Sequence, residues 1–388
     1  MGRRNRYDSA MTATSLRSLE TPALLLDEQR MDRNIARMRG HLAALGVTFR
    51  PHVKTNKSID VSRRLLSTPQ GPITVSTLLE ADYFAAHGVT DILYAVCIAP
   101  NKLDHVARLQ AQGVRLSLIL DSLETAQLLA ERARSGQQLE VLVEIDTDGH
   151  RSGVKPEAPQ LVEIGRTLQE AGVIVKGVMT HAGASYDCRS PEALRAMAEQ
   201  ERSGAVRAAE RLRAAGIEAP VVSVGSTPTA LFAQQLEGVT EVRAGVFVFF
   251  DLVMAGIGVC TVDDIALSVL GTVIGHRPDK GWTLVDAGWM AMSRDRGTAS
   301  QPVDQGYGLV CDADGRPLDD LVMVGANQEH GIVAHRSGKL DGALHLPVGT
   351  QLRILPNHAC STAAQYPEYK VIGPSGDVTA VWPRFSGW

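Results

Sequence analysis

The sequence has no excess of either charge and no long apolar run, and both absences exclude classes of protein. Its 39 lysines and arginines nearly balance 43 aspartates and glutamates, and no basic stretch is interleaved with aromatic residues. This balance argues against a nucleic-acid-binding surface. No apolar run reaches the ~18 residues that a membrane-spanning helix needs. The chain has 388 residues, enough for a barrel of about 250 residues and a smaller partner domain.

Cysteine is scarce as well. The chain has five widely spaced cysteines: Cys97, Cys188, Cys260, Cys311 and Cys360. An odd, scattered set is unlike a disulfide framework, so we expect reduced thiols and a cytoplasmic protein. Cys97 and Cys260 lie in apolar surroundings that predict small core residues. The first 20 residues are basic but lack the apolar core of a secretory signal, so they predict a disordered tail.

Short Val/Ile/Leu-rich runs alternate with amphipathic stretches over the first two-thirds of the chain. Eight runs predict strands, at residues 47–54, 73–77, 91–96, 115–121, 139–146, 173–181, 221–227 and 241–249. The stretches between them are rich in Ala, Leu, Arg and Glu, which favours helix. Eight strand–helix units predict a (β/α)8 barrel over residues 21–260. An open doubly wound sheet would need a glycine-rich turn after its first strand, and that strand ends in a lysine instead.

The pattern changes at about residue 261. From there to residue 388 the apolar runs are short, rich in Val, Leu and Ile, and separated by Gly, Pro and Asp. This pattern predicts an antiparallel β domain. The stretch DADG, at residues 312–315, predicts a hairpin turn within it.

The carboxyl ends of barrel strands carry the chemistry of this fold. The first predicted strand ends in Lys54 and the seventh in the loop Gly225–Thr229. Small residues let backbone N–H groups approach an anion, although such a loop can also simply cap the next helix. A lysine at a fixed distance from a phosphate anchor is what pyridoxal 5'-phosphate requires. We also expect Arg50, His52 and Lys57 to surround Lys54 and favour its neutral amine.

Seven motifs in a fixed order make the sequence resemble a known family. They are RPHVKT, HRSGV, THAG, GSTPT, DAGW, EHG and PNHAC. Together they resemble the fold-type III pyridoxal-phosphate enzymes of the D-serine dehydratase and D-threonine aldolase group. The likeness extends from about Thr21 to Trp388. It implies an alanine-racemase-like barrel, a C-terminal β domain that the run Ala23–Asp27 would join, and a homodimer.

The resemblance also implies roles for single residues. Lys54 corresponds to the lysine that binds the cofactor covalently, and Arg151 of HRSGV to an arginine beside the cofactor. The phosphate-binding residues would be Gly225, Ser226 and Thr227. A hydroxyl is expected to face the pyridine nitrogen, and both Thr180 and Tyr186 fit that position.

The motif PNHAC places His358 and Cys360 two residues apart, which on a strand puts both side chains on one face. Imidazole and thiolate are ligands that zinc prefers. By spacing alone, a core cysteine beside a capping histidine is the commoner arrangement. The resemblance instead implies that the pair holds a divalent metal, which could be zinc, manganese, cobalt or magnesium. The motif NQEHG adds Gln328 as a candidate substrate contact, and Glu329 and His330 either orient a ligand or form a turn.

The activity that the resemblance implies is elimination of water from a D-β-hydroxy amino acid. D-threo-3-hydroxyaspartate would give oxaloacetate and ammonia, and D-serine would give pyruvate and ammonia. Lys54 would remove the Cα proton, and the metal would take the leaving hydroxide. The alternative is an aldolase that cleaves Cα–Cβ with His181 as base. A racemase would need no metal, and a plain binding protein would lack the β domain.

A substrate with a second carboxylate needs an additional cation. The stretch MSRDRGT, at residues 292–298, supplies Arg294 and Arg296 in a polar loop after DAGW. Either arginine could bind that carboxylate, and arginines in such loops are more often solvated.

Overall fold

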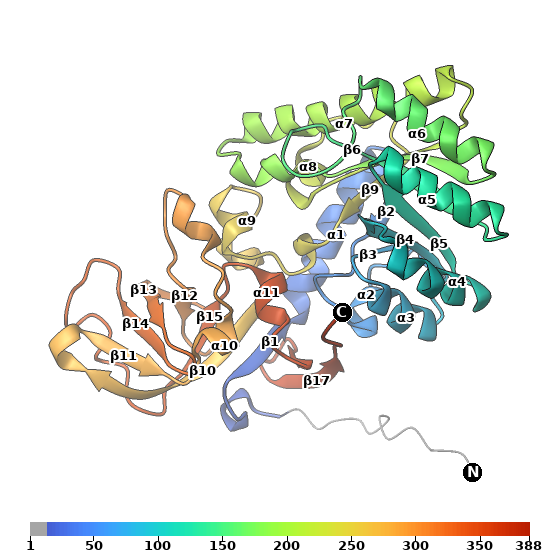
Figure 1. Cartoon of the computed structure of the whole chain (residues 1–388). Coiled ribbons are helices and arrows are strands. Elements are labelled where there is room, and N and C mark those ends of the chain that lie inside the picture. The colour runs from blue at the N-terminus through green and yellow to red at the C-terminus, as the bar shows by residue number, and fades with distance from the viewer. Residues whose placement is uncertain (1–13) are drawn as a thin grey trace, which may run out of the picture. The chain divides into compact units, whose positions relative to one another are not determined.

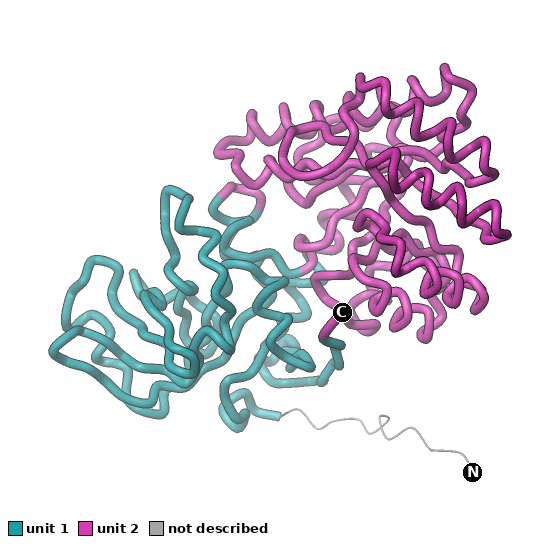
Figure 2. Tube along the Cα trace, in the orientation of Figure 1, with its two compact units in different colours: residues 1–33, 249–256, 260–386 teal, residues 34–248, 257–259, 387–388 magenta. Residues whose placement is uncertain are grey.

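The computed structural model describes residues 14–388, which form two compact units (Figure 2). The barrel unit contains residues 34–248, 257–259 and 387–388, and the β unit contains the described residues up to 33, 249–256 and 260–386. The disordered tail expected at residues 1–20 lies outside the described residues as far as residue 13. Beyond it, Thr14 forms a β-bridge with Val378 and Leu16–Ser18 (η1) form a 3-10 helix, so residues 14–20 are not a tail.

Eight parallel strands form the barrel, as the sequence predicted (Figure 1). They are β2 (Thr48–Pro51), β3 (Ile73–Val75), β4 (Asp91–Cys97), β5 (Arg115–Leu120), β6 (Glu140–Ile145), β7 (Ile174–Thr180), β8 (Val221–Val224) and β9 (Glu241–Ala244). Their order is β2-β9-β8-β7-β6-β5-β4-β3, and a bridge between His52 and Thr74 closes the ring. Because all strands are parallel, their carboxyl ends share one end of the barrel, which we call the rim.

Helices connect these strands and cover the outside of the barrel (Figure 1). They are α1 (Glu28–Ala44), α2 (Ile59–Arg63), α3 (Leu78–Ala86), η2 (Pro100–Lys102), α4 (Leu103–Ala111), α5 (Leu123–Arg134), α6 (Pro159–Glu170), α7 (Pro191–Ala214) and α8 (Thr227–Phe232), with the 3-10 helices η3 (Gly183–Asp187) and η4 (Val246–Val248) at the rim. Thr77, Ser122 and Ser190 cap α3, α5 and α7 by accepting an N–H three residues later. Each cap satisfies a donor that the first helical turn leaves unpaired.

A nine-stranded sheet forms the core of the β unit, and the expected antiparallel β domain is confirmed. Its strands are β1 (Ala23–Asp27), β10 (Leu267–Arg277), β11 (Trp282–Val285), β12 (Leu309–Cys311), β13 (Pro317–Ala326), β14 (Gly331–His335), β15 (Gln351–Leu355), β16 (Glu368–Ile372) and β17 (Val378–Pro383). Strand β1 pairs antiparallel with β10 and parallel with β16. The N-terminal run, far from this domain in sequence, is therefore one of its central strands.

Short helices interrupt this unit at α9 (Leu252–Gly256), α10 (Trp289–Met292) and α11 (Ala359–Ala363), and as 3-10 turns at η5 (Val262–Asp264), η6 (Pro278–Lys280) and η7 (Gly297–Ser300). The predicted DADG hairpin turn is confirmed, because Gly315 N donates to Asp312 O at 3.0 Å between β12 and β13. Strand β16 and the helix α11 were not predicted. The helix matters most, because it contains Cys360.

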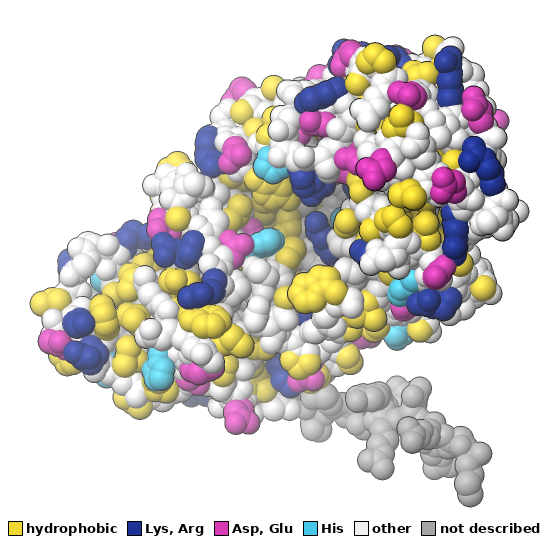
Figure 3. Space-filling model, in the orientation of Figure 1, with side chains coloured by type: hydrophobic (Ala, Val, Ile, Leu, Met, Phe, Trp, Pro, Cys, Tyr) yellow, Lys and Arg dark blue, Asp and Glu magenta, His cyan; other side chains and the backbone are white. Residues whose placement is uncertain are grey.

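The described residues include no helix that is long and apolar enough to cross a membrane. Figure 3 shows lysine and arginine side chains interspersed with acidic ones over the visible face, without a large region of one sign. A mixed surface of this kind fits the sequence-based exclusion of nucleic acid as a partner.

Replacing Gly177 by alanine should destabilise the barrel strongly. Gly177 on β7 has φ +149°, and an added Cβ would lie 1.8 Å from the Val221 carbonyl oxygen of the neighbouring strand. Backbone strain and overlap together predict a loss of roughly 2–6 kcal/mol. Gly172→Ala is the matched control, because its φ is +81° but an added Cβ meets nothing within 4 Å. Thermal melting should show a much larger drop for Gly177→Ala, and equal drops would contradict this account.

Candidate active site

Lys54 lies at the rim, just beyond β2, in the turn between that strand and α2. Its side chain is exposed, and among the described residues it forms no hydrogen bond or ion pair. The turn is held on both sides, because Val53 N donates to Thr74 O at 3.0 Å and Lys57 N donates to Val53 O at 2.9 Å. An amine without a partner on a fixed turn is available to react with a ligand.

Two of the three cations expected around Lys54 are paired with carboxylates. Arg50 bonds to Glu241 at 2.8 Å and to Asp91 at 2.9 Å. Lys57 forms an ion pair with the buried Glu80 at 3.4 Å. Both cations are therefore neutralised by carboxylates. Of the expected neighbours, His52 is the one that interacts with Lys54 electrostatically.

His181 follows β7 and lies near Lys54. Burial and the charge of Lys54 lower the pKa of His181 to about 3. Its Nδ1 lies 3.1 Å from Gly225 O, an acceptor, so Nδ1 carries the proton and Nε2 has a free lone pair. Burial and the same lysine also lower the pKa of His52. The rim thus holds two imidazoles that are neutral at physiological pH.

The loop after β8 requires glycine at its first position. Gly225 has φ +135°, and an added Cβ would lie 2.0 Å from Arg243 O on β9. Ser226 then caps α8 in a capping box with Thr229, and its hydroxyl lies 2.9 Å from that of Ser185. The Thr227 hydroxyl accepts Phe247 N at 3.2 Å. The loop therefore caps α8, as one interpretation of GSTPT expected, and it also brings small residues to the rim. Its role in phosphate binding stays a prediction.

Sequence reasoning missed the carboxylate that anchors this loop. Glu201 of α7 is 2% exposed, and its Oε1 accepts Ala182 N at 2.9 Å and Gly225 N at 3.0 Å. One atom thus holds the loop after β7 to the loop after β8. The sequence pattern could have indicated a buried carboxylate here, because Glu201 interrupts the apolar face of a predicted helix.

Arg243 on β9 was missed as well. It is 3% exposed, its Nε donates to the Ser223 hydroxyl at 2.9 Å, and its Nη2 donates to Thr180 O. The Thr180 hydroxyl, a candidate partner of the pyridine nitrogen, lies 3.0 Å from that of Thr147. The other candidate, Tyr186, lies in η3 with its ring centroid 6.4 Å from that of His181. The choice between the two hydroxyls stays open.

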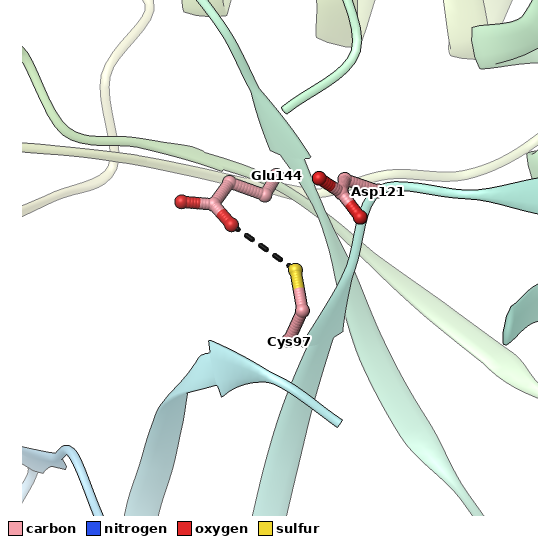
Figure 4. Close-up of side chains that lie close together, drawn as sticks. All are labelled: Cys97, Asp121 and Glu144. Atoms are coloured by element: carbon pink, nitrogen blue, oxygen red, sulfur yellow. Dashed lines mark hydrogen bonds between the residues drawn. The ribbon is translucent and has the colours of Figure 1, made fainter. Parts of the chain in front are cut away.

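Cys97, Asp121 and Glu144 end three adjacent strands and point toward one another (Figure 4). Cys97 packs against an apolar cluster of Leu93, Ile119, Leu142 and Met179, as expected, but its thiol also donates to Glu144 Oε2 at 3.2 Å. Burial and the two carboxylates raise the pKa of this thiol, which keeps its proton available for the hydrogen bond to Glu144. The other oxygen of Glu144 lies 3.4 Å from Arg151 Nη2 and holds that arginine at the rim.

In the β unit, His358 and Cys360 do not lie on a strand, so the strand geometry predicted for them is wrong. His358 is the N-cap residue of α11 and Cys360 is in the helix. The two side chains nevertheless interact. Burial lowers the pKa of His358, but Cys360 and Asp295 outweigh it and raise the value to about 11.

Asp295 fixes the orientation of the His358 ring. Its Oδ2 lies 2.8 Å from His358 Nδ1, and its Oδ1 accepts Gly297 N at 2.8 Å. A carboxylate on Nδ1 leaves Nε2 to bind a metal, which is the usual arrangement of a metal-ligating histidine. Asp251, which is 1% exposed, accepts Ala359 N at 3.0 Å and so anchors the start of α11. Neither aspartate was singled out in the sequence.

Of the remaining candidates, Gln328, Glu329 and His330 are exposed in the turn between β13 and β14. Asn327 N donates to His330 O at 2.8 Å, so the reading of this motif as a tight turn fits the structure. Gln328 O accepts Met290 N at 3.1 Å, which ties the turn to α10. Arg294 and Arg296 follow α10 directly.

Two family models match this chain, one over most of the barrel and one over most of the β domain. The family model described as the alanine racemase N-terminal domain matches residues 26–253. A second model, the putative serine dehydratase domain, matches residues 266–372. The chain belongs to the alanine racemase-like D-serine dehydratase family.

Individual relatives cover nearly the whole chain. D-threo-3-hydroxyaspartate dehydratase of Delftia sp. (strain HT23) is 57% identical over 96% of this chain and 99% of its own, and its solved structure superposes with a TM-score of 0.94. D-serine dehydratase of Dictyostelium discoideum is 28% identical over 94% of this chain and 96% of its own. D-threonine aldolase from Filomicrobium marinum is 25% identical, with a TM-score of 0.80, covering 97% of this chain and 98% of its own.

The residues at the rim fit the pyridoxal phosphate of this family. His52 Nδ1 is buried without a hydrogen-bond partner in the described part of the chain, as expected where a polar ligand belongs. Lys54 supplies an amine without a partner among the described residues, and the loop that begins at Gly225 brings Ser226 and Thr227 to the same rim. In the β unit, imidazole and thiol are donors that suit a zinc-like ion. The individual roles of these residues remain predictions.

Acid should destabilise the barrel through His181. The folded pKa of about 3 lies below the ordinary value of 6.5, so the unfolded chain binds more protons between these pH values. Stability is therefore lost as pH falls from 6.5 toward 3, by about 1.4 kcal/mol at pH 5.5. Urea unfolding of the cofactor-free protein at pH 7.5 and 5.5 should show a smaller difference for His181→Gln. An unchanged difference would contradict the assignment.

Asp295→Asn should weaken metal binding, because the ring of His358 loses its charged anchor. Loss of such a partner reduces metal affinity about 10- to 100-fold. Competition with a fluorescent zinc chelator measures the dissociation constant directly. Asp279→Asn, an exposed aspartate paired with Arg277 in the same unit, is the control and should leave the constant unchanged. Equal affinities of wild type and Asp295→Asn would rule out this role.

Proposed function

We propose that this chain is a pyridoxal-phosphate- and divalent-metal-dependent dehydratase that eliminates water from a D-β-hydroxy amino acid, with D-threo-3-hydroxyaspartate as the main substrate. The observation that carries the proposal is the His358–Cys360 pair, anchored by Asp295 and Asp251. Metal ligands are what a hydroxide leaving group requires, because an oxygen bound to a divalent ion becomes far more acidic than bulk water. His358 and Cys360 would thus hold the metal that stabilises the departing hydroxide when the C–O bond breaks.

The barrel unit supplies the groups that act at the α-carbon. Pyridoxal phosphate, when bound, withdraws electrons from Cα and makes its proton acidic. Lys54 would attach the cofactor through its Nζ and, as the free amine, would take the Cα proton. Gly225, Ser226 and Thr227 would hold the phosphate. Arg151, whose Nη2 lies 3.4 Å from Glu144 Oε1, would bind on the cofactor's side of the site. Thr180 or Tyr186 provides the hydroxyl at the pyridine nitrogen.

The β unit supplies the groups that act at the β-carbon. His358 Nε2 and the Cys360 sulfur bind the metal, which could be zinc, manganese, cobalt or magnesium. Two protein ligands leave positions for the substrate hydroxyl. After water is lost, the product rearranges and is hydrolysed, so D-threo-3-hydroxyaspartate gives oxaloacetate and ammonia. D-serine, which lacks the second carboxylate, would give pyruvate and ammonia.

The relatives support this choice. D-threo-3-hydroxyaspartate dehydratase of Delftia sp. is 57% identical to this chain over 96% of this chain's length. A solved structure of a variant of that dehydratase is described as a metal-free form, which supports a metal in the normal protein. We further propose a cytoplasmic homodimer, in line with five cysteines that form no disulfide. The functional domains are proposed as residues 21–260 for the cofactor and 261–388 for the metal.

The purified protein should convert D-threo-3-hydroxyaspartate to oxaloacetate and ammonia in equal amounts. Oxaloacetate is followed by coupling to malate dehydrogenase, and ammonia by a separate assay. Borohydride should fix the cofactor to the peptide that contains Lys54, detected by mass spectrometry. EDTA should stop turnover while the cofactor stays attached, because metal and cofactor have separate ligands. Zn²⁺, Mn²⁺ or Co²⁺ should restore activity in the wild type but not in Cys360→Ala.

Two results would overturn the proposal. Full activity after exhaustive chelation would remove the metal from the reaction. Release of glycine and glyoxylate from 3-hydroxyaspartate would instead identify an aldolase, with His181 as the candidate base.

A further inference from the structure

The two arginines that follow α10 differ in what they contact. Arg296 Nη2 lies 2.7 Å from Asp304 Oδ2, and its guanidinium lies 5.0 Å from the ring centroid of Tyr307. Arg294 is exposed and stacks 4.7 Å from the ring centroid of Trp289. Within residues 14–388, Arg294 has no carboxylate partner and donates no hydrogen bond. Arg296 is thus neutralised, whereas the charge of Arg294 is available to a ligand.

Arg294 lies in a turn that is fixed on both sides. Ser293 has φ +77°, which is strained for a residue other than glycine, and its N–H donates to Trp289 O at 2.8 Å. Thr362 of α11 donates to Met292 O at 2.6 Å, and Asn357 Nδ2 donates to Asp295 O at 3.0 Å. Stacking on Trp289 holds the guanidinium itself. The side chain is therefore ordered before any ligand arrives.

The same turn contains the anchor of the proposed metal ligand. Arg294 is directly followed by Asp295, whose carboxylate bonds to His358. A cation is thus fixed one residue from the group that orients the metal site. In 3-hydroxyaspartate the β-carbon bears both the hydroxyl and the second carboxylate. A substrate whose hydroxyl binds the metal must place that carboxylate within a few ångströms of it.

We infer that Arg294 binds the β-carboxylate of the substrate and makes the enzyme selective for hydroxyaspartate over D-serine. The inference rests on the proposed function and names a substrate class for the same site. Arginine suits this role, because its planar guanidinium matches a carboxylate with two parallel hydrogen bonds. Other candidates nearby are engaged: Arg336 bonds to Gln305 at 2.6 Å, and the Gln328 amide bonds to Glu329 at 3.3 Å.

The test compares Arg294→Ala, Arg294→Lys and Arg296→Ala in the metal- and cofactor-loaded enzyme. Arg294→Ala should lower kcat/KM for D-threo-3-hydroxyaspartate about 10- to 100-fold, the worth of a charge-assisted hydrogen-bonded pair. For D-serine, which has no β-carboxylate, kcat/KM should change less than about threefold. Arg294→Lys keeps the charge without the planar fork and should fall between wild type and Arg294→Ala. Arg296→Ala is the matched control, with no selective loss on either substrate.

A binding measurement separates recognition from chemistry. D-aspartate carries the second carboxylate but has no hydroxyl to eliminate, and D-alanine lacks both groups. Calorimetry should show Arg294→Ala weakening D-aspartate about 10- to 100-fold while leaving D-alanine within about threefold.

The outcomes distinguish this inference from the proposed function. If Arg294→Ala loses the same factor on both substrates, or loses nothing, Arg294 does not select the β-carboxylate. A selective loss in Arg296→Ala instead would assign the role to the other arginine and overturn the inference. If the wild type neither binds nor dehydrates hydroxyaspartate, the proposed function itself fails.

Discussion

One buried carboxylate sets the spacing on which the cofactor site depends. Glu201 extends from the middle of α7 and accepts Ala182 N and Gly225 N on the same oxygen. Ala182 follows His181, and Gly225 begins the loop proposed to bind the phosphate, so one acceptor positions the imidazole and the loop together. Burial raises the pKa of Glu201, and Arg243 acts against it by stabilising the anion. A buried carboxylate of this kind is costly unless hydrogen bonds and a nearby cation compensate it.

The cations near the proposed site fall into two groups, those paired with carboxylates and those without such a partner among the described residues. Arg50, Lys57 and Arg296 all have carboxylate partners at 2.7–3.4 Å. Lys54 and Arg294 have none among the described residues, and each lies on a turn held by backbone hydrogen bonds. An unpaired cation on a rigid support is well suited to receive a charged ligand, because no internal partner must be displaced.

The sequence predicted the barrel well because eight Val/Ile/Leu-rich runs alternate with helical stretches, and each run became a strand within a few residues. It predicted that Lys54, His181 and the Gly225 loop would lie at one rim, because the carboxyl ends of the strands in this fold meet there. The residues that hold these groups in position could not be predicted in the same way. Glu201 and Asp295 lie far along the chain from the groups they hold, and only folding brings them together. The α11 helix was missed because five residues carry too little helical periodicity.

The position of β1 has a consequence for the order in which the protein is assembled. Residues 23–27 are synthesised before every other strand described here, but their partners lie at residues 267–270 and 370–372. The barrel strands, at residues 48–244, are all synthesised within that interval. During synthesis the barrel can therefore close while the first strand still lacks both neighbours, because domains fold as their residues emerge. The β unit is completed only when its last strands arrive, so a chain arrested before residue 267 would combine a closed barrel with an unpaired β1 strand.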